Sequence, residues 1–174
     1  MISVLKTKKC LEASAKSNWH TGLEWVYSKL KPMYIAEAIL ENADGSDLID
    51  YKFHCFNGEP RLLFLASDRY KGDNTLKFDW YDMELNHLPF KSKGYDTTNK
   101  KIEWFPEFDQ MKEIARKLSA NIPNVRVDLY LVNGQIYFGE LTFYHDAGFV
   151  PLEPFEWELK LGEMIHLPSP PKNN

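Results

Sequence analysis

The sequence has few of the features that mark secreted, zinc-binding or membrane proteins. It contains only two cysteines, Cys10 and Cys55, and no CxxC or His-Cys cluster, which argues against a disulfide framework and a zinc site. No apolar run approaches the roughly 20 residues that span a bilayer, and the amino terminus lacks the apolar core of a signal peptide. We therefore expect a cytoplasmic protein without a membrane span.

The sequence also has no excess of positive charge, with 21 Lys and Arg residues against 25 Asp and Glu. The net charge is −4 and no run of Lys or Arg interrupts the chain, which argues against a nucleic-acid partner. The 174 residues are 44% hydrophobic and 26% charged, which is ordinary for one soluble domain with a core of its own. Aromatic residues make up 14%, so we expect packing rich in rings.

The hydrophobic pattern predicts helices at both ends and strands between them. Proline and glycine clusters separate the segments. The predicted elements are helical residues 1–31, a buried strand at 33–40, a hairpin of strands 50–56 and 61–66 joined by residues 57–60, one or two short edge strands within 67–105, an amphipathic helix at 107–120, and a short helix at 154–164. Cys55 is predicted to be a small buried hydrophobe.

A second predicted hairpin, residues 124–143, contains the most informative residues. Two strands rich in β-branched and aromatic residues flank Asn133-Gly134, a strong turn signal. Three charged residues, Arg126, Asp128 and Glu140, interrupt these apolar strands. Burying a charge in a sheet is costly unless it is paired or binds a metal.

The length of the turn decides whether the three charges meet. A two-residue turn aligns the aliphatic residues of the two strands, but it places Asp128 and Glu140 on opposite faces. A three-residue turn, with Gly134 in a G1 bulge, pairs Arg126 with Glu140 and Asp128 with Phe138, so all three charges share a face. We predict the three-residue turn because it accounts for the charges.

Two carboxylates and an arginine on one sheet face suit a magnesium ion that carries a polyphosphate. Magnesium takes one or two protein carboxylates, and Arg binds phosphate oxygens through two parallel hydrogen bonds. The alternative is a surface salt bridge between Arg126 and a neighbouring carboxylate. Lys52 is similarly open to two interpretations, a phosphate ligand or a lysine that reaches the solvent from a strand.

Several sequence motifs occur here in the order found in one enzyme family. Together they resemble the TupA-like branch of the ATP-grasp family over roughly residues 19–167. The motifs are Ile35-Ala-Glu37, Asp50-Tyr-Lys-Phe-His-Cys-Phe-Asn-Gly58, Asp68-Arg69, Val125-Arg-Val-Asp-Leu-Tyr130, Tyr137-Phe-Gly-Glu-Leu-Thr-Phe143 and the closing Pro154, Trp157 and Leu161-Gly162.

The resemblance implies a fold, a reaction and a domain organisation. We expect an α+β fold, a mostly antiparallel sheet with helices packed on one face, like the C-terminal subdomain of an ATP-grasp enzyme. Such enzymes use ATP and Mg²⁺ to convert a carboxylate to an acylphosphate, which an amine then attacks. The TupA-like branch acts in cell-surface polysaccharide or peptide biosynthesis. The implied boundaries are a helical connecting segment at 1–31, the subdomain at 32–167 and a frayed tail at 168–174.

The resemblance also assigns roles to individual residues. Asp128 and Glu140 match the metal ligands, with Thr142 in the place where most ATP-grasp proteins have an asparagine ligand. The residues assigned to the nucleotide, phosphate or acyl substrate are Arg126, Lys52, Arg69 and the hinge residues Glu37, Ala38, Ile39 and Leu40. His145 is either a catalytic base or a hydrogen-bonding residue at the end of a loop.

One half of the family's nucleotide site has no counterpart in the sequence. Before Pro32 there is a single glycine, Gly22, and no glycine-rich loop with a phosphate-binding lysine. We therefore expect the carboxyl-terminal part of the enzyme, as a natural truncation, a shortened piece or half of a split enzyme. A partner chain with the missing half, or a homodimer, would complete the site. The alternative is a non-catalytic remnant or interaction module.

Overall fold

The computed structural model describes residues 29, 36–46, 48–67 and 76–169. The chain divides into two compact units, and the larger one comprises Leu40–His145 and Val150–Asn174. The strands and α-helices named below belong to this larger unit. Apart from residue 29, the predicted helical segment 1–31 lies outside the described residues.

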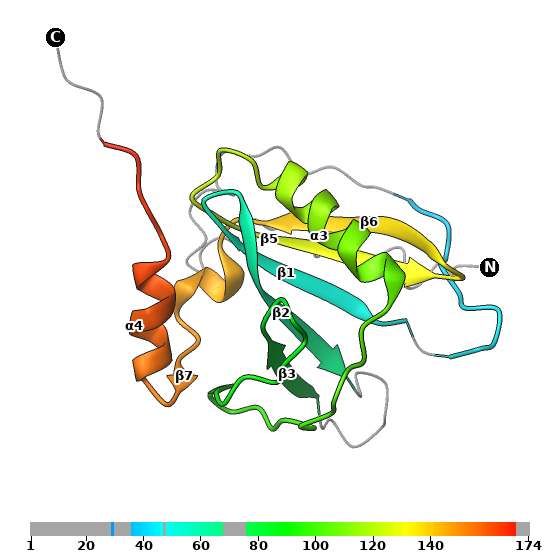
Figure 1. Ribbon diagram of the computed structural model, residues 1–174, viewed down its shortest axis with the longest axis horizontal. Helices are drawn as coiled ribbons and strands as arrows, with labels where there is room; N and C mark the ends of the chain where they lie inside the picture. Colours follow the sequence, from blue (N-terminus) through cyan, green and yellow to red (C-terminus); the bar gives the residue numbers. More distant parts are fainter. Residues whose placement is uncertain (1–28, 30–35, 47, 68–75, 170–174) are drawn as a thin grey trace, which may run out of the picture. The chain divides into compact units, whose positions relative to one another are not determined.

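A five-stranded antiparallel sheet, in the order β3-β2-β1-β5-β6, forms the framework (Figure 1). Its strands are β1 (Asp50–Phe56), β2 (Glu59–Ser67), β3 (Lys77–Tyr81), β5 (Asn124–Val132) and β6 (Gln135–Thr142). The remaining elements are β4 (Lys91–Ser92) paired with β7 (Leu152–Glu153), helices α3 (Pro106–Leu118) and α4 (Glu156–Glu163), and the 3-10 turn η2 (His145–Gly148). The predicted antiparallel α+β architecture is confirmed.

Helix α3 covers one face of the sheet, as predicted for residues 107–120. Its apolar stripe of Phe108, Met111 and Ala115 is fully buried against the inward side chains of β1 and β5, such as Phe53 and Val127. Because alternate residues of a strand point to opposite faces, every second residue of these strands belongs to this core. Cys55 is among them and is fully buried, as expected.

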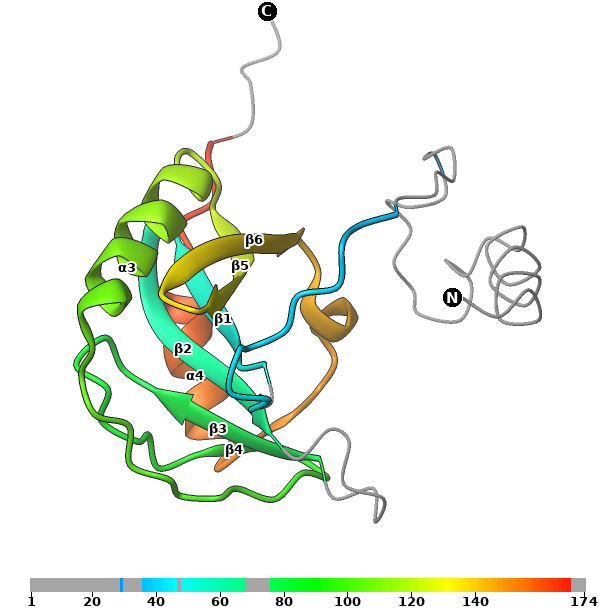
Figure 2. The same ribbon diagram turned by 90° about the vertical axis from the view of Figure 1, so that its right-hand side faces the viewer.

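The opposite face of the sheet is divided between an apolar and a polar half. The apolar half contains Phe64, Trp80 and Phe90, and α4 packs on it through Trp157, whose ring stacks on Phe90 at 4.5 Å. Figure 2 shows α3 and α4 on opposite sides of the sheet. The expectation of helices on one face therefore holds for α3 but is wrong for α4.

The central hairpin has a two-residue turn, so the predicted three-residue turn is wrong. Val132 pairs with Gln135, and both Asn133 (φ 51°) and Gly134 (φ 77°) adopt left-handed conformations, as a type I′ turn requires. Further along, Val127 pairs with Leu141. The two-residue turn pairs apolar residues of the two strands, such as Leu131 with Ile136, and this pairing determined the turn length.

A β-bulge in β6, and not the turn, places Arg126, Asp128 and Glu140 on one face of the sheet. Leu129 pairs with Phe138 and Val127 with Leu141, so Gly139 and Glu140 together lie opposite Asp128 alone. An extra residue in one strand reverses the face of every residue beyond it. Glu140 therefore lies on the face of Arg126 and Asp128 after all. Both predicted pairings are nevertheless wrong, because Arg126 pairs with Thr142 and not with Glu140, and Asp128 does not pair with Phe138.

Two other expectations near the amino-terminal end of the described chain need correction. The first hairpin also has a two-residue turn, because Phe56 pairs with Glu59, and Glu59 and Pro60 belong to β2. A register shift between His54 and Cys55 follows. Residues 36–40 form no strand and are mostly exposed, with Ile39 at 84%, so the predicted buried strand is wrong where it is described.

Candidate functional site

The polar half of the sheet face begins with alternate residues of β1. Asp50, Lys52 and His54 occupy every second position of this strand, so they share one face. The antiparallel register places Lys52 beside Asp128 and His54 beside Arg126. All five side chains belong to buried residues with at most 8% exposure. A row of charged groups is therefore buried across two central strands.

Asp128 is the centre of this cluster. Its Oδ1 accepts a hydrogen bond from Arg126 Nε at 2.7 Å, and its Oδ2 accepts one from Arg126 Nη2 at 2.8 Å. Lys52 Nζ also donates to Oδ2, and it forms a second ion pair with Asp50 at 2.5 Å. Both oxygens of a carboxylate that is only 1% exposed are thus satisfied by two cations. Lys52 is a buried ion-pair partner and not a lysine that reaches the solvent.

Arg126 connects Asp128 to the more accessible Glu140. The Nη2 atom that donates to Asp128 also donates to Glu140 Oε1 at 3.0 Å. Thr142 Oγ1 donates to the same oxygen at 3.3 Å. The Glu140 side chain is 62% exposed, so the cluster opens to solvent on the side of β6.

His145 begins the 3-10 turn η2, shortly after β6, and contacts the same guanidinium. Its Nδ1 is 2.6 Å from Arg126 Nη1. Because a guanidinium can only donate, Nδ1 is the acceptor and a proton on the ring resides at Nε2. The predicted hydrogen bond at the end of the loop is therefore present, and Nδ1 is engaged and is not available as a base in this arrangement.

His54 is the most unusual titratable group of the cluster. Burial lowers its pKa well below the ordinary range, and the neighbouring His145, Arg126 and Lys52 lower the pKa further. Its Nε2 atom is buried without a hydrogen-bond partner. The ring packs against Trp80 at 4.8 Å and edge-on to His145 at 5.1 Å. His54 is therefore neutral at pH 7.

The carboxylates keep Arg126 charged despite its burial. Burial by itself would lower its pKa, but hydrogen bonds to Asp128 and the charges of Asp128, Glu140 and Asp50 outweigh that effect and raise the pKa above the ordinary value. The cluster thus consists of two fixed cations, three carboxylates and two imidazoles on one sheet face.

The structure brings together six of the residues that the sequence singled out for a site. They are Lys52, Arg126, Asp128, Glu140, Thr142 and His145. Arg69 lies outside the described residues. The hinge residues Glu37, Ala38 and Ile39 are exposed members of the smaller unit, and Leu40 begins the larger one.

Sequence reasoning missed Asp50 and His54 as members of the cluster. The signal was available, because both lie two positions from Lys52 in a strand whose other residues are apolar or aromatic. Alternation in a strand places such residues on one face. What the sequence did not reveal is that β1 and β5 are neighbours, since 67 residues separate the end of β1 from the start of β5.

The donor set is compatible with magnesium in its chemistry. Among the described residues there is no group of three or more His, Cys, Asp or Glu placed to hold a metal ion. Magnesium, however, usually takes only one or two carboxylates and completes its shell with water and phosphate oxygens. Asp128 and Glu140 supply two carboxylate oxygens within 3.0 Å of a single nitrogen atom.

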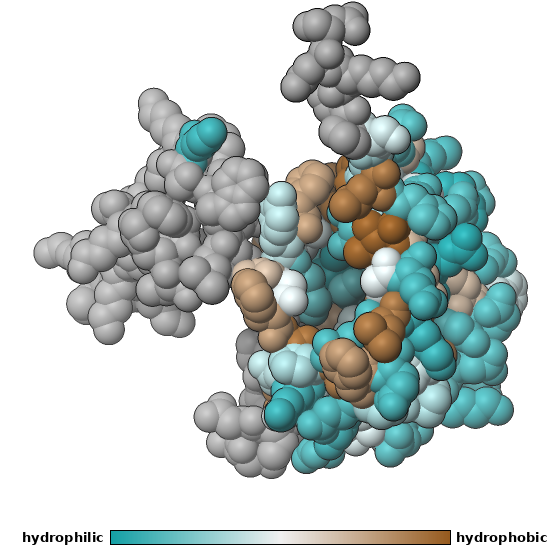
Figure 3. All heavy atoms as spheres, turned by 90° about the vertical axis from the view of Figure 1, so that its left-hand side faces the viewer, coloured by the Kyte–Doolittle hydropathy of each residue, from teal (hydrophilic) through white to brown (hydrophobic). Residues whose placement is uncertain are grey.

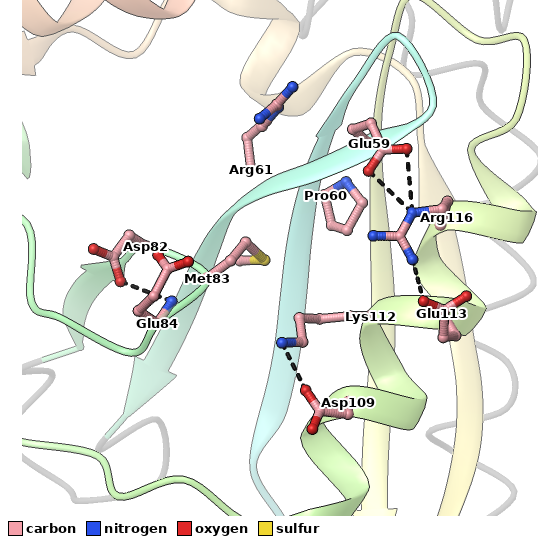
Figure 4. A pocket seen from close by; sticks show the side chains of 10 residues that line it. All are labelled: Glu59, Pro60, Arg61, Asp82, Met83, Glu84, Asp109, Lys112, Glu113 and Arg116. Atoms are coloured by element: carbon pink, nitrogen blue, oxygen red, sulfur yellow. Dashed lines mark hydrogen bonds and ion pairs between the residues drawn. The ribbon is translucent and has the colours of Figure 1, made fainter.

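A separate hollow of about 490 Å³ lies between α3, the start of β2 and the turn after β3 (Figure 4). Its charged groups mostly pair with one another. Arg116 binds Glu59 and Glu113, and Lys112 binds Asp109 at 2.7 Å. The hollow is open and its ion pairs are on the surface, so it lacks the buried polar groups that mark the cluster around Asp128.

Comparison with protein families defines the class of protein. The family model described as TupA-like ATPgrasp matches residues 1–166, almost the whole chain. The match assigns the protein to the ATP-grasp class, and within that class the chain belongs to the TupA-like family. The chain matches no curated protein and no solved structure. In the described part of the chain, no helix has the length and apolar character to cross a membrane.

Proposed function

We propose that the chain supplies the Mg²⁺–ATP-binding half of an ATP-dependent carboxylate–amine ligase. Family membership supports the reaction class. The observation that carries the proposal is the guanidinium of Arg126, whose Nη2 bridges Asp128 Oδ2 and Glu140 Oε1. A buried sheet face that holds two carboxylates around a cation, with one side open to solvent, is suited to metal and phosphate.

Each residue of the cluster has a role in the proposal. Asp128 and Glu140 would hold Mg²⁺, with Thr142 supporting Glu140 through its hydroxyl. When bound, the metal neutralises phosphate oxygens and so makes phosphoryl transfer to a carboxylate easier. Arg126 and Lys52 donate to the phosphate oxygens and orient them, because both cations already lie on this face.

Other features of the proposal reach beyond the cluster. Glu37, Ala38, Ile39 and Leu40 would contact the adenine and ribose, and Arg69 the phosphate or the acyl substrate. The remainder of the nucleotide site, with its glycine-rich loop, would come from other residues or from a partner chain. By resemblance to the family, the product belongs to cell-surface polysaccharide or peptide biosynthesis and is made in the cytoplasm.

Calorimetric titration with Mg²⁺–ATP tests the proposal. We expect specific binding by the wild-type chain and an affinity at least tenfold lower for Glu140→Gln, since a carboxylate ligand to the metal is removed. Asp128→Asn should lose binding as well, provided circular dichroism shows that it is folded. Glu113→Gln is the matched control, because it neutralises an exposed glutamate that pairs with an arginine outside the cluster.

Two outcomes would contradict the proposal. One is a folded wild-type chain that binds no Mg²⁺–ATP. The other is that Glu140→Gln and the control Glu113→Gln both bind Mg²⁺–ATP as tightly as wild type. Either result would remove the metal-binding role from the β5–β6 hairpin.

The second candidate function is a non-catalytic interaction module. It is favoured by exposed apolar side chains at the α4 end, Phe155 at 60%, Leu159 at 56% and Leu167 at 79%. The face seen in Figure 3 shows several hydrophobic residues at the surface. Self-association that Leu159→Glu abolishes, together with no nucleotide binding by wild type, would support this function over the ligase.

A further inference from the structure

A cation already occupies the position between the two proposed metal ligands. Arg126 Nη2 lies 2.8 Å from Asp128 Oδ2 and 3.0 Å from Glu140 Oε1. Magnesium requires its oxygen ligands at about 2.0–2.1 Å. A metal ion that binds this pair of oxygens must therefore displace the nitrogen that lies between them.

Moving Arg126 away is unfavourable unless it finds another acceptor. The residue is only 8% exposed, and its fork makes three hydrogen bonds to the two carboxylates. A buried charge that loses its partner is strongly destabilising. Lys52, which also pairs with Asp128, cannot take the place of a lost anion because it is itself a cation. A metal ion that arrives alone must therefore compete with an internal cation.

A phosphate group changes this balance because it offers Arg126 new oxygen acceptors in the same place. His145 keeps the guanidinium near the site meanwhile, since its Nδ1 accepts from Nη1 and not from the atoms that bind the carboxylates. Arg126 can thus exchange carboxylate oxygens for phosphate oxygens without leaving the cluster. Guanidinium groups bind both kinds of oxygen through two parallel hydrogen bonds.

We propose that Arg126 is a built-in counterion that excludes free metal from Asp128 and Glu140, so that the site accepts a divalent cation only together with a phosphate. This inference rests on the proposed function and adds a rule for the order of binding. The metal and the phosphate enter as one complex, and Arg126 moves from the carboxylates to the phosphate as they do. His145 acts as a positioning residue for the guanidinium.

Binding of Mn²⁺ alone, followed by electron paramagnetic resonance, tests the inference without any catalytic readout. We expect Arg126→Gln to bind Mn²⁺ at least tenfold more tightly than wild type, because the competing charge is gone. The same variant should bind the preformed Mn²⁺–tripolyphosphate complex more weakly than wild type. Arg116→Gln is the matched control, since Arg116 also bridges two carboxylates, Glu59 and Glu113, but outside the cluster.

A second variant covers the case in which Arg126→Gln does not fold. Arg126→Lys keeps the positive charge but loses the fork that reaches both carboxylates, so Mn²⁺ binding should tighten by a smaller factor. The inference is overturned if every folded variant binds Mn²⁺ as wild type does, whether tightly or not at all. In that case the calorimetric titration separates the two proposals. If wild type binds Mg²⁺–ATP and Glu140→Gln does not, the counterion role of Arg126 is wrong but the proposed function stands.

Discussion

Asp128 and Glu140 are both carboxylates of the cluster, but their surroundings are opposite. Asp128 is 1% exposed and holds two cations, whereas the Glu140 side chain is 62% exposed and accepts from Arg126 and Thr142. Losing one partner of a buried ion pair leaves an uncompensated charge, while an exposed pair contributes little. Asp128 thus has a structural role in addition to its proposed role as a metal ligand.

We predict that Asp128→Asn lowers the free energy of unfolding by about 3–5 kcal/mol, because Lys52 and Arg126 are left buried without their shared anion. Glu140→Gln should cost less than about 1 kcal/mol. Urea denaturation followed by circular dichroism measures both. Equal effects of the two substitutions would contradict the difference in burial on which this prediction depends.

His54 makes the stability depend on pH in a predictable direction. Its folded-state pKa is well below the unfolded value, so the unfolded chain binds more protons as the pH falls through about 6.5. Stability contributed by the neutral ring is complete above that pH and is lost below it. From pH 7.5 to 5.5 we expect a loss on the order of 1 kcal/mol from this residue.

Denaturation of wild type and of His54→Phe at both pH values measures that loss. The aromatic replacement suits the neighbouring Trp80 and Phe64 rings and does not titrate, so the variant should lose less stability on acidification than wild type. An identical pH dependence of the two proteins would show that His54 is not the responsible group.

At the scale of elements, the β-bulge in β6 determines whether the cluster exists. A Cβ atom at Gly139 would lie 3.0 Å from the carbonyl oxygen of Asp128 and 3.0 Å from the Tyr130 ring. Such contacts are tighter than most Cβ contacts in proteins, so the neighbouring atoms would have to shift by a few tenths of an ångström. The glycine therefore permits the close approach of two strands at the bulge, and the bulge places Glu140 beside Arg126.

We predict that Gly139→Ala destabilises the protein by about 1–3 kcal/mol through overpacking and weakens Mg²⁺–ATP binding by displacing Glu140. Gly162→Ala is the control, because its added methyl group meets no atom within 4 Å and it lies in helix α4, where alanine is favoured by up to about 1 kcal/mol. Thermal denaturation and calorimetry measure the two effects. A Gly139→Ala protein as stable as wild type would contradict the role of the glycine.

At the scale of the whole molecule, Cys55 reports on the integrity of the core under α3. Burial raises the pKa of its thiol to about 11, and a thiol reacts as its thiolate. In a Cys10→Ser variant at pH 8 we expect Cys55 to react with a disulfide reagent only as fast as the chain unfolds. Reaction within seconds in native buffer would show an open core. A Cys55→Ala variant separates the contribution of Cys10.

Local patterns predicted much of this molecule because they depend on neighbours in the chain. The stripe of Phe108, Met111 and Ala115 predicted α3, and the alternation around the two Asn-Gly turns predicted two hairpins. The strand expected at residues 36–40 failed, because an apolar run does not specify a partner strand. The predicted turn length was wrong because the extra residue lies within β6, at Gly139 and Glu140, and not at the turn. A bulge inside a strand has no strong sequence signal.

The sequence by itself determined which residues carry charge in the apolar strands, and so that Arg126, Asp128 and Glu140 needed partners. Only the tertiary structure determined which residues are those partners. Pairing of β1 with β5 brings Lys52 and His54 to Asp128 and Arg126, and the bulge at Gly139 and Glu140 places Glu140 on their face. Register between strands distant in sequence depends on the packing of the whole sheet, which no local pattern contains.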